Sequence, residues 1–120
     1  CSKAVADTIT RALKAVTEDG TAKRLKGAKC SVAGKTGTSF GTYANGKYVD
    51  EHGRRKYQGT FVGFFPAEDP QYSIISVVYS KPTNKSFQGG GIPAKAIRTV
   101  IDRIYDIDPY FQETLRQKRK

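Results

Sequence analysis

The residues best suited to chemistry lie in the stretch SVAGKTGTSFG, residues 31–41, where Gly34, Lys35 and Thr36 are consecutive. Gly-Lys-Thr also ends the nucleotide-binding P-loop, which needs another glycine five positions before the first of these residues. Position 29 is Lys29, so the spacing is wrong. A P-loop also opens a helix, whereas the residues after Thr36 are mostly glycine, threonine and serine, which are poor helix formers. The sequence therefore argues against a phosphate-binding loop.

The alternative is that this stretch is a β-strand. Alternation would then direct Lys35 and Gly37 to one face, and Thr36 and Thr38 to the other. A lysine supplies a compact positive charge, and a glycine lets another backbone approach closely. An edge strand of this kind can accept an extended peptide, hold a carboxylate and offer an N–H to an oxyanion. A surface lysine beside a turn glycine is the simpler interpretation, and the tripeptide alone does not decide between them.

The elements that must position these residues follow from hydrophobic periodicity and turn signals. The predicted elements are a helix at 2–18, strands at 30–38, 57–66 and 72–80, and a helix at 93–105. Short connections between the last two strands favour antiparallel pairing. We expect one domain over residues 1–120 with an α+β fold, in which flanking helices pack on a three-stranded antiparallel sheet.

Two segments are expected to lie outside this framework. Residues 39–56 read as a long loop with its own hairpin, because Asn45-Gly46 between Tyr43 and Tyr48 is a strong two-residue turn signal. Residues 106–120 read as a basic tail, in which a short helix begins at Asp108 and then frays.

The strand at 57–66 is apolar on both faces. Phe61 and Phe65 alternate with Val62 and Phe64, so this strand requires cover on both sides. If part of that cover is absent, we expect self-association of the chain or pairing with other polypeptide.

The chain carries 21 basic and 11 acidic residues, a net charge of +10. Such a balance fits either a nucleic-acid surface or a solvated surface with a basic tail. Nucleic-acid motifs such as a zinc-ligand set are missing from the sequence, which favours the second interpretation. His52 is the single histidine, so no metal site is expected.

Four features in order resemble the penicillin-binding protein family, in which Lys-Thr-Gly is one of the motifs. They are Gly-Thr-Ala at 20–22, Ala-Gly-Lys-Thr-Gly-Thr at 33–38, the strand and turn at 59–70, and a glycine-rich loop and helix at 89–105. The pattern is most similar to class B peptidoglycan D,D-transpeptidases. The resemblance implies the serine β-lactamase/transpeptidase-like fold.

The same resemblance implies an enzyme that cross-links peptidoglycan stem peptides ending in D-Ala-D-Ala through an acyl-serine intermediate, and that β-lactams acylate. Lys35, Thr36, Gly37 and Thr38 would then bind the substrate: Lys35 would face its carboxylate, and the Thr38 N–H would contribute to the oxyanion hole. No cofactor is implied. The family works at the periplasmic face of the inner membrane.

The chain departs from the family in lacking Ser-x-x-Lys, the motif of the nucleophile, and Ser-x-Asn. In the family both precede Lys-Thr-Gly, and the chain also has no methionine. We therefore expect the C-terminal part of a longer transpeptidase, inactive alone, anchored through the missing N-terminal part and completed by the remainder of its parent. A catalytic residue is not expected in this chain.

Three questions stay open at this point. Tyr43 and Tyr48 would contact the cleft if the loop 39–56 forms its wall or lid, but a surface loop explains them equally. A non-catalytic peptide- or cell-wall-binding module derived from the family is the alternative to the enzyme. A basic nucleic-acid-binding domain is the third candidate, although no nucleic-acid partner is expected.

Overall fold

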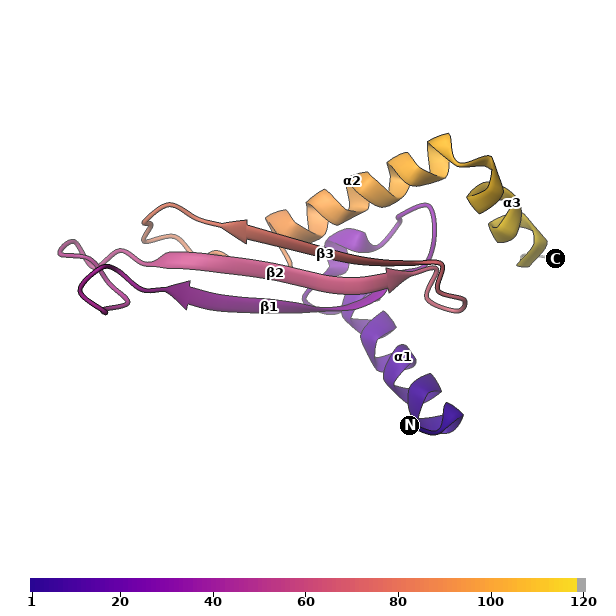
Figure 1. The fold of residues 1–120 in the computed structure, drawn as a ribbon, viewed down its shortest axis with the longest axis horizontal. Coiled ribbons are helices and arrows are strands. Elements are labelled where there is room, and N and C mark those ends of the chain that lie inside the picture. Colours follow the sequence, from indigo (N-terminus) through magenta and orange to yellow (C-terminus); the bar gives the residue numbers. More distant parts are fainter. Residues whose placement is uncertain (119–120) are drawn as a thin grey trace.

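A computed structural model describes residues 1–118, and its three strands form one antiparallel sheet (Figure 1). The strands are β1 (Ala33–Gly41), β2 (Lys56–Phe65) and β3 (Tyr72–Tyr79), in the spatial order β1-β2-β3. The helices are α1 (Lys3–Glu18), the short 3-10 helix η1 (Lys23–Leu25), α2 (Ile92–Ile107) and α3 (Pro109–Lys118). The expected α+β fold is confirmed, and β1 is an edge strand.

One face of the sheet carries the hydrophobic core. Phe61 and Phe65 of β2 are almost completely buried, in one cluster with residues of α2 and α3. Helix α2 runs along this side of the sheet, and α3 follows it beyond the end of the strands (Figure 1). From α2 come Ile97 and Ile101, one turn apart on the apolar face that the periodicity predicted. Phe111 of α3 packs edge-on against Phe65, with ring centroids 6.0 Å apart. These contacts hold the C-terminal helices to the sheet.

The other face is open to solvent over much of its area. Val62 is 49% exposed and Ile75, opposite it on β3, is 64% exposed. Helix α1 projects away from the sheet towards its N-terminus (Figure 1), and its apolar residues Val5 and Ile9 are about half exposed. The sequence indicated that β2 needs cover on both faces. The described residues cover one of these faces and leave the other largely exposed.

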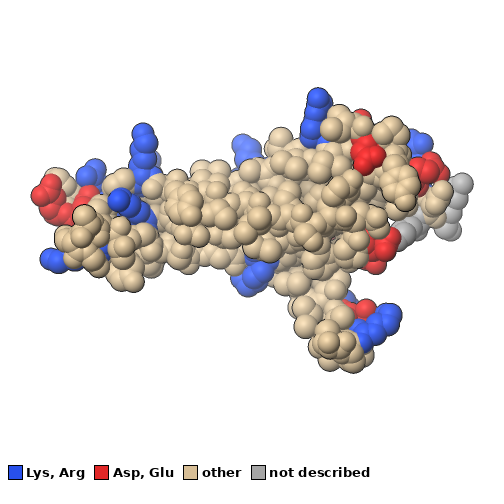
Figure 2. Space-filling model, viewed as in Figure 1, with Lys and Arg blue, Asp and Glu red and all other residues tan. Residues whose placement is uncertain are grey.

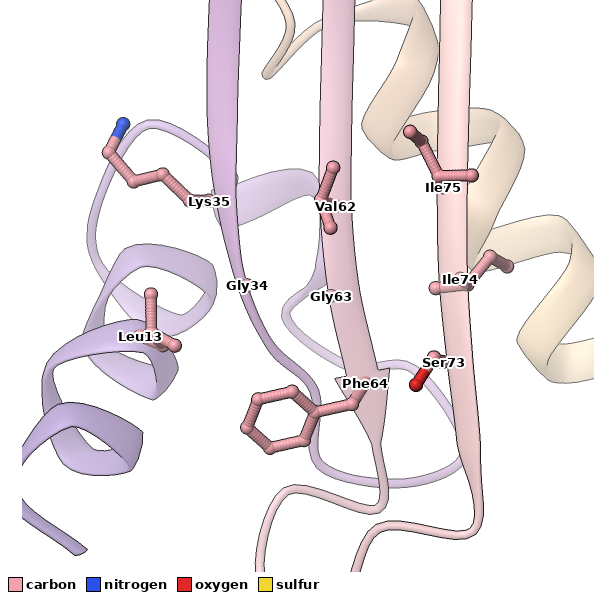
Figure 3. Close-up of a pocket in the computed structure, with 9 residues that line it drawn as sticks. All are labelled: Leu13, Gly34, Lys35, Val62, Gly63, Phe64, Ser73, Ile74 and Ile75. Atoms are coloured by element: carbon pink, nitrogen blue, oxygen red, sulfur yellow. The ribbon is translucent and has the colours of Figure 1, made fainter. Parts of the chain in front are cut away.

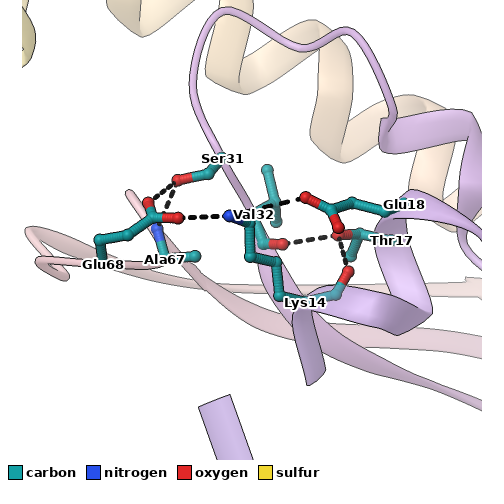
Figure 4. Close-up of polar contacts among 7 residues, drawn as sticks. All are labelled: Lys14, Thr17, Glu18, Ser31, Val32, Ala67 and Glu68. Atoms are coloured by element: carbon teal, nitrogen blue, oxygen red, sulfur yellow. Dashed lines mark hydrogen bonds and ion pairs between the residues drawn. The ribbon is translucent and has the colours of Figure 1, made fainter. Parts of the chain in front are cut away.

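A polar cluster joins the C-terminal half of α1 to the sheet (Figure 4). The buried Thr17 hydroxyl donates to the Val32 carbonyl at 2.6 Å. The Lys14 ammonium lies 2.5 Å from the Glu68 carboxylate in the β2–β3 turn, and the Ser31 hydroxyl donates to the same carboxylate. These contacts hold α1, the residues just before β1 and the β2–β3 turn together.

Strand β1 begins at Ala33 and continues to Gly41, whereas the sequence predicted that it would begin at Cys30. The ladder between β1 and β2 cannot extend beyond Phe65 in the ordinary way, because Pro66 has no N–H. The Ala67 N–H instead donates to the Ser31 carbonyl at 3.0 Å. Residues 30–32 therefore form an entrance to the strand.

The connection between β1 and β2 covers residues 42–55, shorter than the predicted loop at 39–56. The Asn45-Gly46 turn is present: the Tyr43 N–H donates to the Lys47 carbonyl at 2.9 Å, and Gly46 has a φ of 77°. A second turn follows, in which Asp50 accepts from the Arg54 backbone and side chain at 2.8 Å. The predicted turn at Asn45-Gly46 is thus accompanied by a second turn that the sequence did not predict.

The predicted basic tail at 106–120 is mostly helical. Helix α2 continues to Ile107, the Asp108 carboxylate accepts from the Tyr110 and Phe111 N–H groups, and α3 follows. The short helix that the sequence predicted from Asp108 is present as α3, and its Phe111 is buried in the core, so this helix packs on the sheet and does not extend as a tail. The expected fraying falls at residues 119–120, which lie outside the described residues. Among residues 1–118, no helix combines the length and apolarity needed to cross a membrane.

Candidate functional site

Lys35, Thr36, Gly37 and Thr38 lie in the middle of the edge strand β1. They pair with β2 on one side, and no strand among residues 1–118 pairs with their other backbone edge. Thr36 is opposite the buried Phe61 and Lys35 is opposite the exposed Val62, so the two side chains take different faces as predicted. The exposed Lys35 ammonium donates to the Thr36 carbonyl at 2.9 Å. A charge and a free strand edge thus occur together.

The two threonine hydroxyls are held by residues from distant parts of the sequence. The hydroxyls of Thr36 and Thr21 are 2.9 Å apart, and either can be the donor. The Gly89 N–H donates to the Thr38 hydroxyl at 3.3 Å. A connection after α1, the strand β1 and the glycine-rich loop before α2 therefore meet beneath Lys35–Thr38.

Sequence reasoning did not place Thr21 and Gly89 in the site. Both contacts join residues that are far apart in the sequence, 15 and 51 positions respectively. Thr21 lies in the Gly-Thr-Ala motif and Gly89 in the glycine-rich loop. Both motifs were noted in the sequence, and placing them next to β1 would have identified these two residues.

The glycine-rich loop touches β1 so closely that only glycine fits. A Cβ added to Gly89 would lie 2.5 Å from the Gly37 carbonyl oxygen and 2.2 Å from that of Thr60. A Cβ on Gly90 would lie 1.8 Å from the Thr21 carbonyl oxygen. The absence of side chains lets three backbones pack together, which fixes the position of the strand.

The two glycines of β1 differ. A Cβ on Gly34 would lie 2.4 Å from the Phe61 ring, so packing within the chain requires glycine there. A Cβ on Gly37 would meet the Thr60 side chain at an ordinary 3.8 Å. Since no contact among residues 1–118 demands glycine at position 37, the free space there is available to a molecule lying along the strand.

Tyr43 and Tyr48 lie in the connection beyond the end of β1, where their contacts are local. The Tyr43 hydroxyl donates to the Arg54 carbonyl at 3.0 Å, and the Lys56 ammonium is 4.5 Å from its ring centroid. Desolvation and the Asp50 carboxylate raise the pKa of Tyr43. Tyr48 is 56% exposed and packs edge-on against Phe40.

An apolar cavity of about 600 Å³ lies on the open face next to Lys35 (Figure 3). Leu13 of α1 forms one wall, and Val62, Phe64 and Ile75 form the floor. In Figure 3 the Phe64 ring is directed towards α1, and the Lys35 side chain extends past the edge of the sheet. The positive charge thus stands at the rim of an apolar hollow.

The model of the penicillin binding protein transpeptidase domain matches residues 1–102. A probable peptidoglycan D,D-transpeptidase PenA from Neisseria gonorrhoeae is 37% identical over 93 residues, which is 75% of this chain and 15% of the relative. The peptidoglycan D,D-transpeptidase FtsI from a Buchnera aphidicola strain is 29% identical over 109 residues, which is 88% of this chain and 18% of that protein. The chain thus spans less than a fifth of the length of these curated relatives.

Two solved structures share the fold. The transpeptidase domain of FtsI4 D,D-transpeptidase from Legionella pneumophila superposes with a TM-score of 0.64 at 28% identity, covering 86% of this chain and 36% of that domain. The D,D-transpeptidase domain of a peptidoglycan glycosyltransferase from Eggerthella lenta gives a TM-score of 0.56 at 26% identity, covering 89% of this chain and 21% of the other.

Proposed function

We propose, given that this chain belongs to the penicillin-binding protein transpeptidase family, that it supplies the substrate-binding strand of a class B peptidoglycan D,D-transpeptidase. The observation that carries the proposal is the Lys35–Thr38 sequence on a free strand edge, with Thr36 and Thr38 anchored from below. A stem peptide ending in D-Ala-D-Ala would lie along this edge in an extended conformation.

Each residue of the strand has a role in this proposal. Lys35 supplies positive potential for the substrate carboxylate, and rotation of its exposed side chain away from the Thr36 carbonyl presents the charge. The Thr36 and Thr38 hydroxyls hydrogen-bond the carboxylate or its proton network. The Thr38 N–H contributes to the oxyanion hole, and Gly37 leaves room for the peptide backbone.

Thr21 joins this set as a positioning residue. Its hydroxyl contacts the Thr36 hydroxyl and thereby fixes the direction in which Thr36 presents its proton or lone pair. Sequence reasoning assigned Thr21 no role of this kind.

The nucleophile must come from polypeptide outside this chain, since none of its serines has a lysine three residues later. The same polypeptide would cover the open sheet face and the cavity beside Lys35. The chain exposes 7958 Å² of surface, against about 6,400 Å² for a compact monomer of its mass. The excess of roughly 1,500 Å² is about twice the roughly 800 Å² that one partner buries in an interface of standard size. Alone, the chain would self-associate through this face.

We further infer that the protein acts at the bacterial cell envelope, where its substrate is assembled, anchored through sequence outside residues 1–120. The curated relatives named as peptidoglycan transpeptidases support this location. β-Lactams are the expected inhibitors of the intact protein.

The test is covalent labelling of the intact protein with a fluorescent penicillin. We expect a band that survives denaturation, and a fall of about 10²- to 10³-fold in the acylation rate for Lys35→Ala. Lys95→Ala, an exposed lysine on α2, is the matched control and should label normally. The 120-residue chain alone should not label.

Two outcomes would overturn this assignment in different ways. Absence of labelling in the intact protein, with stem-peptide binding retained, would indicate the alternative, a non-catalytic peptide- or cell-wall-binding module. Labelling of the isolated chain would show that the nucleophile lies within these 120 residues.

A further inference from the structure

Two connections meet at the end of the sheet that lies furthest from α3 (Figure 1). We call residues 40–57 and 79–88 the far-end surface. The Arg55 and Thr83 backbones exchange hydrogen bonds of 3.0 and 2.9 Å, and Tyr57 and Ser80 are joined by two more at 2.8 and 2.9 Å. The two connections therefore form a single built surface.

Aromatic rings form the body of this surface. The Phe40 and Tyr57 rings meet edge-on with centroids 5.2 Å apart, and Phe87 lies 6.3 Å from Tyr57. Tyr48 packs edge-on against Phe40 and is 56% exposed. Tyr79 is 72% exposed and, by the strand register, lies on the opposite face of the sheet from Phe40 and Tyr57. The large exposed apolar groups at this end are thus rings and not aliphatic chains.

The surface is also strongly basic. It carries six basic and two acidic residues, a net charge of +4, and in Figure 2 the blue side chains surround the left end with red ones between them. Arg55 and Lys56 lie over the Phe40 and Tyr43 rings at 4.8 and 4.5 Å. Lys47, Lys81 and Lys85 are exposed to solvent. Two of the cationic groups thus lie directly over aromatic rings, and the three lysines add exposed charge.

We propose that the far-end surface binds an anionic polysaccharide, namely a peptidoglycan strand beside the reacting peptide. This partner rests on the proposed function. Flat exposed rings such as Tyr48 can stack on the C–H faces of sugar rings, and the lysines match the carboxylates of stem peptides.

The position of the surface suits this partner. Strand β1 runs from Lys35 directly to the far end, and six residues of strand cover about 20 Å. A peptidoglycan polymer that places one stem peptide along the edge of β1 can therefore contact the far-end surface with its neighbouring sugars or stem peptides. Two weak contacts on one polymer raise the apparent affinity without changing either contact.

The experiment is co-sedimentation of the intact protein with insoluble peptidoglycan at low ionic strength. Lys81→Glu combined with Lys85→Glu should raise the apparent Kd about tenfold, and added salt should remove the difference from wild type. The control is Lys23→Glu combined with Lys95→Glu, two exposed lysines outside the surface with the same change in charge. Circular dichroism verifies the fold of both variants.

A second pair of variants tests the rings. Tyr48→Ala should weaken sedimentation several-fold, whereas Tyr110→Ala, which removes a ring that is 78% exposed on α3, should not. Equal sedimentation of far-end and control variants would overturn the proposal. So would binding of anionic phospholipid vesicles or duplex DNA in place of peptidoglycan.

Penicillin labelling of the same preparations separates this proposal from the proposed function. Far-end variants that label at the wild-type rate but sediment more weakly than wild type support the second binding surface. Normal labelling with unchanged sedimentation overturns this surface alone. Normal sedimentation without any labelling refutes the transpeptidase while the polysaccharide surface remains.

Discussion

Gly34 and Gly37 are three residues apart on β1, yet they are glycines for different reasons. The Phe61 ring occupies the space that a side chain at Gly34 would need, whereas the space for a side chain at Gly37 is free. The first is a packing requirement of the chain. The second has no such requirement within residues 1–118, and the proposed function assigns the space beside Gly37 to the substrate backbone.

Substitution of each glycine by alanine should separate the two explanations. Gly37→Ala should leave the free energy of unfolding nearly unchanged but slow penicillin acylation of the intact protein by about 10- to 100-fold, because its methyl group displaces the ligand. Gly34→Ala should cost about 1–3 kcal/mol of stability through overpacking. Urea denaturation and labelling kinetics measure both. A Gly37→Ala protein that acylates normally would contradict the proposed role of the strand.

Cys30 offers a second test at this scale. Burial, with contributions from the Asp102 and Glu68 carboxylates, raises the pKa of the Cys30 thiol to about 12. The reactive thiolate is therefore scarce at pH 8. We expect iodoacetamide to modify Cys30 of the intact folded protein much more slowly than the same cysteine after denaturation. Mass spectrometry of the peptide measures the two rates, and equal rates would show that the thiol is accessible and ionised.

At this scale the sequence predicted the four residues of the strand and the faces they take. Alternation alone is enough for that, because it is a local property of any strand. Thr21 and Gly89 could not be placed in the same way. Their contacts with Thr36 and Thr38 depend on how the chain returns to β1 after α1 and before α2.

Among the elements, the attachment of α1 to the sheet depends on the polar cluster around Glu68. Although desolvation acts in the opposite direction, hydrogen bonds from Lys14 and Ser31 lower the pKa of the Glu68 carboxyl. A carboxyl with a lowered folded-state pKa stabilises the fold above its ordinary pKa, and this contribution is lost as the pH falls through the folded-state value.

Glu68→Gln should therefore reduce the stability of the intact protein at pH 7, with the difference from wild type shrinking below about pH 4. The effect should be below about 1 kcal/mol, because the pair is largely exposed to solvent. Glu113→Gln, on the exposed side of α3, is the control. Thermal denaturation at several pH values measures both, and a difference that persists at pH 3 would contradict this account.

Element boundaries were less predictable than element types. The three strands, α1, α2 and the short helix that begins after Asp108 were predicted in the right order, because periodicity and turn residues specify them locally. Strand β1 begins three residues later than predicted. The Ser31 and Val32 carbonyls accept hydrogen bonds from the Ala67 N–H and the Thr17 hydroxyl, outside the regular ladder. Helix α3 became part of the core because Phe111 reaches Phe65, a contact that no local pattern reveals.

For the whole molecule, the open sheet face is the principal feature. The radius of gyration is 17.0 Å, against about 14 Å for a compact domain of this length. Apolar residues on both faces of β2 indicated from the sequence that cover was needed on both sides. What supplies that cover was not predictable from composition, because an exposed apolar face fits other polypeptide and a second copy equally.

Ile75 provides the test of this cover. It is 64% exposed here, so Ile75→Ala should change stability by less than about 0.5 kcal/mol if the face stays in water. If other polypeptide covers the face in the intact protein, the cost should be about 2–5 kcal/mol. We expect the larger value. Tyr110→Ala on α3 is the control, and chemical denaturation of the intact protein is the measurement.

The close approach of the glycine-rich loop to β1 has a consequence at the level of the gene. Every missense change of a single base in a glycine codon introduces a side chain with a Cβ atom. At Gly89 and Gly90 that atom would overlap the carbonyl groups of Gly37, Thr60 and Thr21. Natural variants at these two codons would therefore displace β1. Mutations at Gly89 and Gly90 would thus change the geometry of the site, even though neither residue offers a side chain to the substrate.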